Sequence, residues 1–453
     1  MSHRVLIVTY LFPPSGGVGT PRYVAYTRHL RDHGCQMSVL CPSRPQTPLY
    51  DPGLMERVPP ETHIHRVFNP EVPYDLRDRI WKGLLKNRPT VKAELDQQPP
   101  GGSSGLLGAP ARWAKRSIQG LFNPDVQKFW VPFVNRAAHR IIREENVDTV
   151  ILNTPPFSLH AIIPPLKKEF PRLKWITEVR DDWLGYYFDQ FDTAASDSKH
   201  ALAVRLEGAG IRASDYVVGV TPAQRDAMRN RYPDQPEAKF LSIPNGFDAD
   251  LFEDFHPSRQ GRSHMVVTYF GSLYRAPVYD ITGYLEALDS LPAAARDRIE
   301  TRFIGRIARE AEPLLEGRRA RLVKMGFFPR AEAIKLLEQT DYMLLAANDP
   351  TTHAGKLFDY LASGLPTIAL TPVEGEIARV FAQTGAGIAV AAHDVAGIRR
   401  TLLDALARLD GQPSAFPEMN RTAVGAFDRR NQVAELVRLT GINAAPEPVA
   451  GIY

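Results

Sequence analysis

The chain has 453 residues, of which 44% are hydrophobic and 23% are charged, and its formal net charge is +4. This composition excludes global disorder. Because a domain typically has roughly 150 residues, the length predicts two or three domains. Two cysteines, Cys35 and Cys41, exclude a disulfide framework and a Cys/His metal site, so we expect a reducing, cytoplasmic setting. The sequence has no run of about 18 apolar residues, so it predicts no membrane-spanning helix. The nearly balanced charge does not indicate binding of nucleic acid.

The first segment predicts a strand, a glycine-rich loop, a helix and a second strand. Residues 5–10 form an apolar, β-branched run that is typical of a strand buried on both faces. Gly16 and Gly17 stand in the loop that follows, Thr20-Pro21 begins a helix, and residues 37–41 form the next strand. Two strands joined by a helix imply a parallel sheet with helices on both faces.

The same alternation continues along the chain and restarts once. Strands are predicted at 149–152, 174–179 and 216–220, and again at 265–270, 303–304, 322–323, 343–345 and 367–370. We therefore predict an α/β protein of two doubly wound domains that face each other across a cleft. The predicted boundaries are 1–243 and 244–424 for these domains, 425–442 for a C-terminal helix that packs back on the first domain, and 443–453 for a tail.

A basic and aromatic insertion at 76–122 interrupts the first domain. It carries nine Lys or Arg residues against three acids, and its Pro/Gly/Ser-rich centre is predicted to be mobile. Such a segment suits an anionic membrane surface, where each Lys or Arg is worth about 1 kcal/mol and tryptophan prefers the interface. A solvated helical hairpin is an equally good interpretation.

Ligands of open α/β sheets bind beyond the carboxyl ends of the strands, where the Gly16-Gly17 loop falls. Glycines let the backbone approach a phosphate, and the N-terminus of the following helix favours negative charge. A dinucleotide-binding dehydrogenase uses a similar loop, but Leu40-Cys41-Pro42 stands where it needs an acidic residue. A tight turn without a ligand also remains open.

The segment 353–366 predicts a helix that begins near Gly355 and stops at Gly364. Lys356 falls in its first turn, where the helix dipole disfavours a cation. A bound diphosphate would explain this lysine, because backbone N–H groups and the ammonium would converge on one anion. Asp359, on the same helical face, could accept hydrogen bonds from ribose hydroxyls. The alternative is a surface ion pair between Lys356 and Asp359.

The second domain opens with the strand 265–270, and Gly271, Ser272 and Arg275 follow it directly. Gly271 permits close backbone approach to a ligand, and Arg275 could grip phosphate oxygens with two hydrogen bonds. The alternative for Arg275 is a surface position beside a loop.

Taken in order along the chain, these motifs resemble those of GT-B glycosyltransferases of the GT4 type, especially bacterial enzymes of exopolysaccharide and cell-surface glycan assembly. The matching stretches are Gly16-Gly17, residues 180–183, Thr221-Pro222, residues 243–248, residues 270–272 and residues 355–366. The resemblance implies two Rossmann-like domains, with a nucleotide-sugar donor bound mainly by the second and a glycan or polyprenyl-linked acceptor mainly by the first. It also implies retention of configuration at the anomeric carbon, without an obligatory metal or other cofactor.

The candidate catalytic residues are Lys356, Arg275 and Asp181. Donor binding is assigned to Gly16, Gly17, Gly271, Ser272, Gly355, Lys356, Leu357 and Asp359. Asp181 could orient an acceptor hydroxyl or pair with Arg180, and His160 and Asp182 are candidates on the acceptor side. For His160, capping of a helix is the alternative.

One departure from the family pattern concerns the donor sugar. The family often carries two glutamates eight positions apart, where this chain has Thr351 and Asp359. Asp359 retains a carboxylate, whereas Thr351 cannot replace a charge, although His353 or Asp349 could do so in part. Two other functions therefore stay open: a GT-B-fold nucleotide-sugar epimerase, and a catalytically weak scaffold of a glycan-assembly complex.

Overall fold

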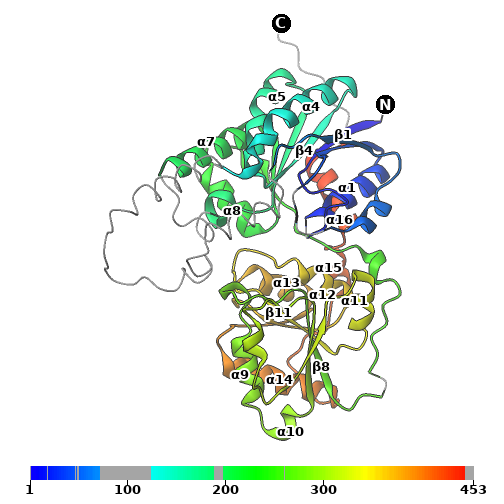
Figure 1. The fold of residues 1–453 in the computed structure, drawn as a ribbon, viewed down its shortest axis with the longest axis vertical. Coiled ribbons are helices and arrows are strands. Elements are labelled where there is room, and N and C mark those ends of the chain that lie inside the picture. The colour runs from blue at the N-terminus through cyan, green and yellow to red at the C-terminus, as the bar shows by residue number, and fades with distance from the viewer. Residues whose placement is uncertain are drawn as a thin grey trace. The chain divides into compact units, whose positions relative to one another are not determined.

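The computed structural model describes residues 2–17, 19–45, 47, 50–71, 124–187, 197–259 and 261–443. Internal contacts divide the chain into two compact units. Unit 1 comprises Met1–Val220, Arg225–Ile243 and Val433–Tyr453, and unit 2 comprises Thr221–Gln224 and Pro244–Gln432. Each unit is built on one parallel β-sheet, and Figure 1 shows helices on both faces of each sheet.

Unit 1 contains a seven-stranded sheet with the order β3-β2-β1-β4-β5-β6-β7. Its strands are β1 (His3–Val8), β2 (Cys35–Pro42), β3 (His63–Val67), β4 (Thr149–Thr154), β5 (Lys174–Val179), β6 (Tyr216–Gly219) and β7 (Phe240–Ser242). All neighbours pair in parallel, as βαβ connections require. The central strands are buried on both faces, which explains their continuous apolar sequences.

The two faces of this sheet carry separate hydrophobic cores. Val5 and Ile7 of β1 pack with side chains of α1 (Thr20–Asp32) and with Val433 of α16 (Arg429–Thr440). Leu6 and Val8 point to the opposite face, which is covered by α4 (Val131–Glu144) and α5 (Ile163–Glu169). This alternation follows from the two-residue period of a strand. Among the described residues of the unit, the remaining α-helices are α7 (Asp197–Ala213) and most of α8 (Pro222–Arg231).

Unit 2 repeats the plan with a six-stranded sheet of order β10-β9-β8-β11-β12-β13. Its strands are β8 (Met265–Phe270), β9 (Ile299–Ile304), β10 (Arg321–Gly326), β11 (Tyr342–Ala346), β12 (Thr367–Leu370) and β13 (Gly387–Val390). Its helices are α9 (Thr282–Asp289), α10 (Ala293–Arg296), α11 (Arg330–Leu337), α12 (Lys356–Ser363), α13 (Glu376–Thr384), α14 (Val395–Leu409) and α15 (Arg421–Gly425). Side chains of α9 and α14 fill one core, and those of α11, α12 and α13 fill the other.

The α/β class and the two doubly wound sheets predicted from the sequence are confirmed. The strands at 174–179 and 265–270 have the predicted bounds, and the helix after Gly355 ends at Gly364, which has a φ of 68°. The pattern does not indicate β3 or β7, because β3 is a half-exposed edge strand and β7 has only three residues. The insertion at 76–122 lies outside the described residues. Among the described helices, none has the length and apolar character to cross a bilayer.

A buried ion pair joins α1 to β5 inside unit 1. The side chain of Arg22 lies with its Nη2 2.8 Å from Oε1 of Glu178, and the hydroxyl of Tyr26 donates to the same carboxylate. Arg22 and Glu178 are only 4% and 1% exposed, so neither charge is solvated by bulk water. Burial alone would raise the pKa of Glu178, but attraction to Arg22 and hydrogen bonds to the carboxylate outweigh it and lower that pKa.

We expect Glu178→Ala to destabilise unit 1 by about 3–5 kcal/mol, because Arg22 would stay buried without a counter-charge. The double variant Arg22→Met/Glu178→Leu should recover most of the loss, since both charges are then removed. Hydrogen exchange of α1 amides, together with urea unfolding, measures the effect. Because the folded pKa of Glu178 is lowered, the stabilisation is present above the usual carboxyl pKa and is lost as the pH falls through the lowered value. Equal exchange in Glu178→Ala and wild type would contradict this.

Candidate functional site

Each sheet contains one topological switch point, where successive connections leave toward opposite sides. In unit 2 this point lies between β8 and β11, and in unit 1 between β1 and β4. Open α/β sheets bind ligands beyond the carboxyl ends of the strands at such a point. The loops after β8 and β11 carry Gly271 and lead to Lys356, and those after β1 and β4 carry Gly17 and His160. Topology therefore brings these four residues to the switch point of their own unit, whereas Asp181 and Asp182 follow β5.

Two glycines shape the loop beyond β8. Gly271 has a φ of 124° and donates its N–H to the carbonyl oxygen of Ile304 at 2.8 Å. Gly305 has a φ of 139°, and a Cβ there would lie 2.3 Å from the carbonyl oxygen of Gly271. Both positions therefore require glycine. A Cβ on Gly271 would also lie only 3.6 Å from Nζ of Lys356, so the bare backbone leaves room beside the ammonium group.

Lys356 is the first residue of α12, and its ammonium group rests on aromatic rings. Nζ donates to the hydroxyl of Tyr269 at 2.6 Å, and it lies 3.9 Å from the Tyr269 ring centroid and 5.7 Å from that of Tyr279. No ion pair of Lys356 is recorded in the described part of the chain. Burial lowers the pKa of Lys356 to about 7, which leaves about half of the molecules protonated at neutral pH. A bound anion would stabilise the charged form.

Tyr360 fixes the position of α12 across the switch point. Its hydroxyl accepts the N–H of Phe270 at 3.0 Å and shares its proton between the carbonyl oxygens of Phe270 and Leu344, each at 3.1 Å. These two residues belong to β8 and β11, so one side chain ties both strands to the helix that carries Lys356. Leu357, the next residue of that helix, is buried in the core and its N–H bonds to the carbonyl oxygen of Ala354.

The other predicted donor residues lie around this point. Gly355 is the N-cap of α12, and the carbonyl oxygen of Ser272 accepts from the hydroxyl of Tyr269 at 3.2 Å. The side chain of Arg275 is exposed, and no hydrogen bond or ion pair is recorded for it among the described residues. Its exposure is compatible with the predicted contact to phosphate and with the alternative of a surface position beside a loop.

Asp359 makes a contact that the sequence pattern did not indicate. Its Oδ1 lies 2.5 Å from Nη2 of Arg330, the first residue of α11, while Lys356 bonds to Tyr269. The alternative ion pair between Lys356 and Asp359 is therefore not formed. A nucleotide ribose at Asp359 would meet a carboxylate already held in place by Arg330.

The loop after β11 contains the departure from the family pattern. Oδ1 of Asp349 accepts from the N–H and hydroxyl of Thr351 and from the N–H of Thr352, so this carboxylate holds the loop. The His353 side chain is 2% exposed, and its Nε2 lies 3.9 Å from the buried carboxylate of Glu376. Burial lowers the pKa of His353 to about 4, so the ring is neutral at neutral pH. Neither Asp349 nor His353 therefore places an exposed charge beside Thr351.

In unit 1, the glycine loop and Arg180 meet at the start of α1. Gly17 has a φ of 102°, and the carbonyl oxygen of Gly16 accepts from the hydroxyl of Thr20 at 3.3 Å. A Cβ on Gly19 would lie 2.5 Å from Nη1 of Arg180, so the absence of a side chain admits this guanidinium. The structure thus adds a cation to the predicted loop.

The predicted acceptor residues differ in exposure. Asp181 is exposed, whereas Asp182 receives both guanidinium ends of Arg231, each at 2.8 Å. Arg231 also bonds to Glu207 at 2.9 Å, so Asp182 belongs to a largely buried cluster. His160 is 1% exposed and stacks on Trp183 with ring centroids 6.2 Å apart, and burial lowers its pKa to about 4. Of the three, only Asp181 is exposed as a whole residue, and desolvation of its carboxyl group raises the pKa of that group.

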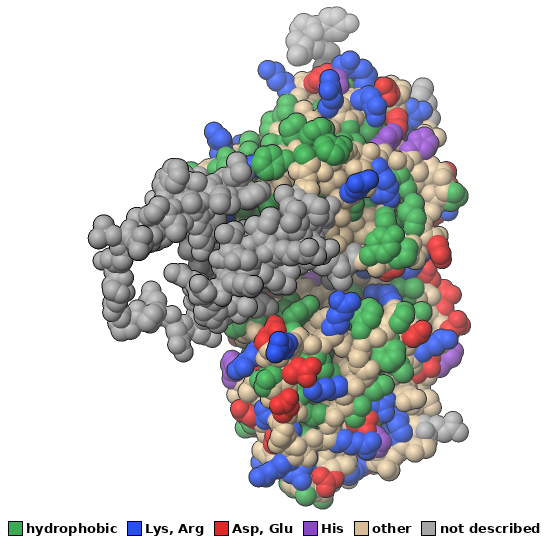
Figure 2. All heavy atoms as spheres, in the orientation of Figure 1, with side chains coloured by type: hydrophobic (Ala, Val, Ile, Leu, Met, Phe, Trp, Pro, Cys, Tyr) green, Lys and Arg blue, Asp and Glu red, His purple; other side chains and the backbone are tan. Residues whose placement is uncertain are grey.

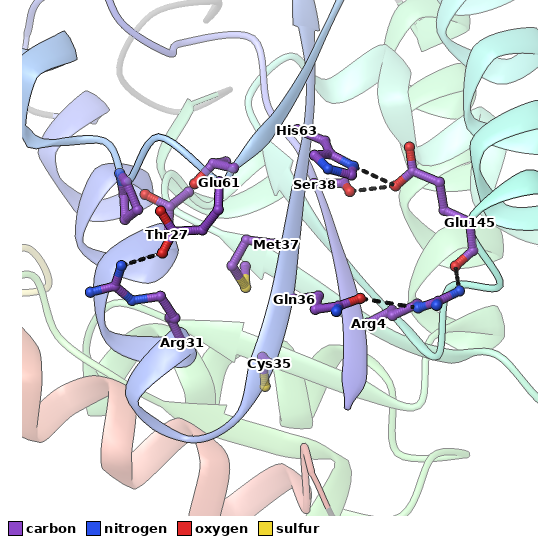
Figure 3. A pocket seen from close by; sticks show the side chains of 12 residues that line it. Arg4, Thr27, Arg31, Cys35, Gln36, Met37, Ser38, Glu61, His63 and Glu145 are labelled. Atoms are coloured by element: carbon purple, nitrogen blue, oxygen red, sulfur yellow. Dashed lines mark hydrogen bonds and ion pairs between the residues drawn. The ribbon is translucent and has the colours of Figure 1, made fainter. Parts of the chain in front are cut away.

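A separate pocket of about 520 Å³ lies in unit 1 at the amino ends of β1, β2 and β3 (Figure 3). Its charged side chains already have partners. Arg31 pairs with Glu61, Arg4 donates to the carbonyl oxygen of Glu145, and the Glu145 carboxylate accepts from Ser38. The pocket faces the edge opposite to the carboxyl ends, so we do not include it in the candidate site.

No family model matches the chain, and no curated protein matches its sequence. Solved structures match over nearly its whole length. The N-terminal domain of Candida albicans trehalose-6-phosphate phosphatase has a TM-score of 0.61 and 13% identity, with 98% of each chain covered. Anabaena HepE, in complex with UDP and glucose, has a TM-score of 0.57 and 15% identity, with 97% of this chain and 99% of that chain covered. A putative UDP-N-acetylglucosamine 2-epimerase from Listeria monocytogenes has a TM-score of 0.51 and 10% identity, with both chains covered fully. This likeness establishes the GT-B fold.

If a nucleoside diphosphate binds beside Lys356, as the sequence predicts, its affinity, measured with UDP or GDP, should fall about tenfold per pH unit above pH 7. Lys356 must be protonated to attract the anion, and its pKa of about 7 in the empty site means that rising pH removes that proton. The ionisation of a terminal phosphate changes little in this range, because with a last pKa of about 6 it is already about nine-tenths ionised at pH 7. Isothermal titration calorimetry from pH 7 to 9 measures the slope. Lys356→Ala should bind weakly and without this slope, and a steep slope in that variant would assign the titration to another group.

Proposed function

We propose that the protein is a glycosyltransferase that moves a sugar from a nucleoside diphosphate-sugar to an acceptor. One observation carries this proposal: at the switch point of unit 2, the Lys356 ammonium lies beside the bare backbone of Gly271. A glycine turn, a helix N-terminus and a cation together suit a diphosphate. Similarity of fold to HepE with UDP and glucose supports a nucleoside diphosphate-sugar as donor.

In the proposed reaction, the leaving group is the nucleoside diphosphate. Negative charge grows on it as the bond to the anomeric carbon breaks, and Lys356, Arg275 and the N-terminus of α12 would stabilise that charge. Ser272, Gly355 and the backbone of Leu357 would line the donor, and Asp359 would receive the ribose hydroxyls. These groups provide the electrostatic help that a metal ion gives elsewhere, so we propose no obligatory metal.

The remaining assignments follow from the resemblance to GT4-type enzymes. We propose a retaining hexosyltransferase of surface polysaccharide synthesis, at the cytoplasmic side of the membrane. Unit 1 would bind a glycan or polyprenyl-linked acceptor, with Gly16, Gly17 and the exposed Asp181 at its carboxyl edge. The basic segment 76–122 would add contact with anionic lipid.

An epimerase is the second candidate, since the Listeria monocytogenes neighbour is a putative nucleotide-sugar epimerase. An epimerase acts on the donor alone, whereas a transferase requires an acceptor. Acceptor dependence therefore separates the two functions, and the absence of turnover with every donor would favour a scaffold.

We expect Lys356→Ala to lower kcat by about 10²–10³-fold, because enzymes that lose one hydrogen-bond donor to a developing oxyanion show a loss of this size. The measurement is release of nucleoside diphosphate from UDP-, GDP- and dTDP-sugars, with and without a lipid-linked acceptor. Lys335→Ala is the matched control, because that lysine is exposed on α11 of the same unit. Undiminished turnover in Lys356→Ala would remove the diphosphate assignment.

We expect deletion of 76–122 to reduce sedimentation with anionic vesicles. The segment contributes nine basic residues, each worth about 1 kcal/mol near an anionic surface. Circular dichroism of the shortened protein checks its folding. If sedimentation is unchanged, the segment has no part in membrane binding.

A further inference from the structure

Exposed aromatic rings gather on unit 1 beside the carboxyl end of β3. Phe68 directly follows that strand and is 61% exposed, and Phe133, in the first turn of α4, is 40% exposed. The two rings pack edge to face with centroids 5.4 Å apart. Phe129, one turn earlier, is 37% exposed. Large apolar side chains grouped in water indicate a surface that another partner covers.

Basic side chains continue this surface along the outer face of α4. Arg136 and Arg140 follow Phe133 by three and seven residues, so all three lie on one stripe of the helix. Both arginines are exposed, whereas Val134, Ala138 and Ile141 bury the inner face. In the described part of the chain, Arg136 has no recorded ion pair, and Arg140 lies 3.8 Å from Glu144. We call Phe68, Phe129, Phe133, Arg136 and Arg140 the α4 surface.

Figure 2 shows hydrophobic side chains grouped on the molecular surface near α4, with Lys and Arg side chains around them. The outer stripe of α4 faces away from the sheet, because Val134, Ala138 and Ile141 on the opposite side of the helix pack in the core. Rings and arginines on one stripe match the two layers of a bilayer interface: rings enter below the headgroups, and guanidinium groups contact lipid phosphates.

We propose that the α4 surface docks unit 1 on an anionic lipid bilayer. A second copy of the chain suits this surface less well, because a two-fold contact would bring Arg136 and Arg140 against the same arginines. The aromatic end of α4 lies at the carboxyl edge of the sheet, where a ligand of unit 1 would sit. Docking there would present the unit to lipid-carried molecules, a consequence that rests on the proposed glycosyltransferase function.

The test is sedimentation of the full-length protein with vesicles of phosphatidylcholine, with and without phosphatidylglycerol, in the absence of donor. Arg136→Glu/Arg140→Glu should lower the partition coefficient on phosphatidylglycerol vesicles at least about tenfold, and wild-type binding should fall with salt. Phe68→Ser/Phe133→Ser should lower it on both vesicle types. The matched controls are Arg309→Glu/Arg399→Glu and Phe327→Ser, which alter exposed residues of unit 2 and should bind as wild type does.

Phe133→Trp separates docking from a loss of folding, because tryptophan prefers the interface and should retain or strengthen binding. Size-exclusion chromatography with light scattering should give the same mass for wild type and both double variants. Unchanged partition in both double variants would overturn the proposal, as would a dimer that they dissociate. No nucleotide-sugar enters this experiment, so its result does not depend on the proposed glycosyltransferase function. If the separate turnover assay showed no activity, lipid binding through the α4 surface would still support the docking proposal.

Discussion

The placement of one ammonium group on an aromatic ring is the interaction on which the candidate site depends. Lys356 contacts Tyr269 because α12 begins beside the end of β8, and Tyr360 ties that helix to both central strands. The ring attracts a cation but neutralises no charge, unlike a carboxylate. The lysine is therefore held in place and remains able to pair with an anion. Burial of the ammonium group lowers the pKa of Lys356, and a bound diphosphate would raise that pKa by stabilising the charged form.

The sequence predicts those features of the site that are formed by residues close together in the chain, but not those that join residues far apart in the chain. The glycines at 271 and 355, the start of α12 and its stop at Gly364 are local features, read from spacing and turn chemistry. Tyr269 and Arg330 are not local features, because their partners Lys356 and Asp359 lie 87 and 29 residues away. Periodicity locates elements, but it does not show which side chain of a neighbouring element meets a given one. The short strands β3 and β7 were missed for a related reason, since pairing stabilises them more than their own pattern does.

The acidic residues of unit 1 illustrate the same limit. Asp181 and Asp182 are adjacent and follow one strand, so the sequence treats them alike. In the structure Asp181 is exposed, whereas Arg231 of α8 binds both Asp182 and Glu207 of α7. Such a cluster must be satisfied as a whole, because an unpaired charge there would be costly. The N–H of Gly185 also donates to Oδ1 of Asp182 at 3.2 Å, so the cluster is bonded to the segment that follows β5.

The loop after β11 bears on how the proposed reaction would be driven. Thr351 carries no charge, Asp349 holds the loop through its hydrogen bonds, and the neutral ring of His353 faces a buried acid. In the proposed reaction, this loop would therefore offer no exposed carboxylate to positive charge at an anomeric carbon, because Asp349 is buried. The nearest anion would be the departing diphosphate itself, held by Lys356 on the face it leaves. In the proposed reaction, the acceptor oxygen would bond to the anomeric carbon on the face that the diphosphate leaves and would pass its proton to a diphosphate oxygen, so the configuration would be retained. The same cation that binds the donor would then also set the face of attack.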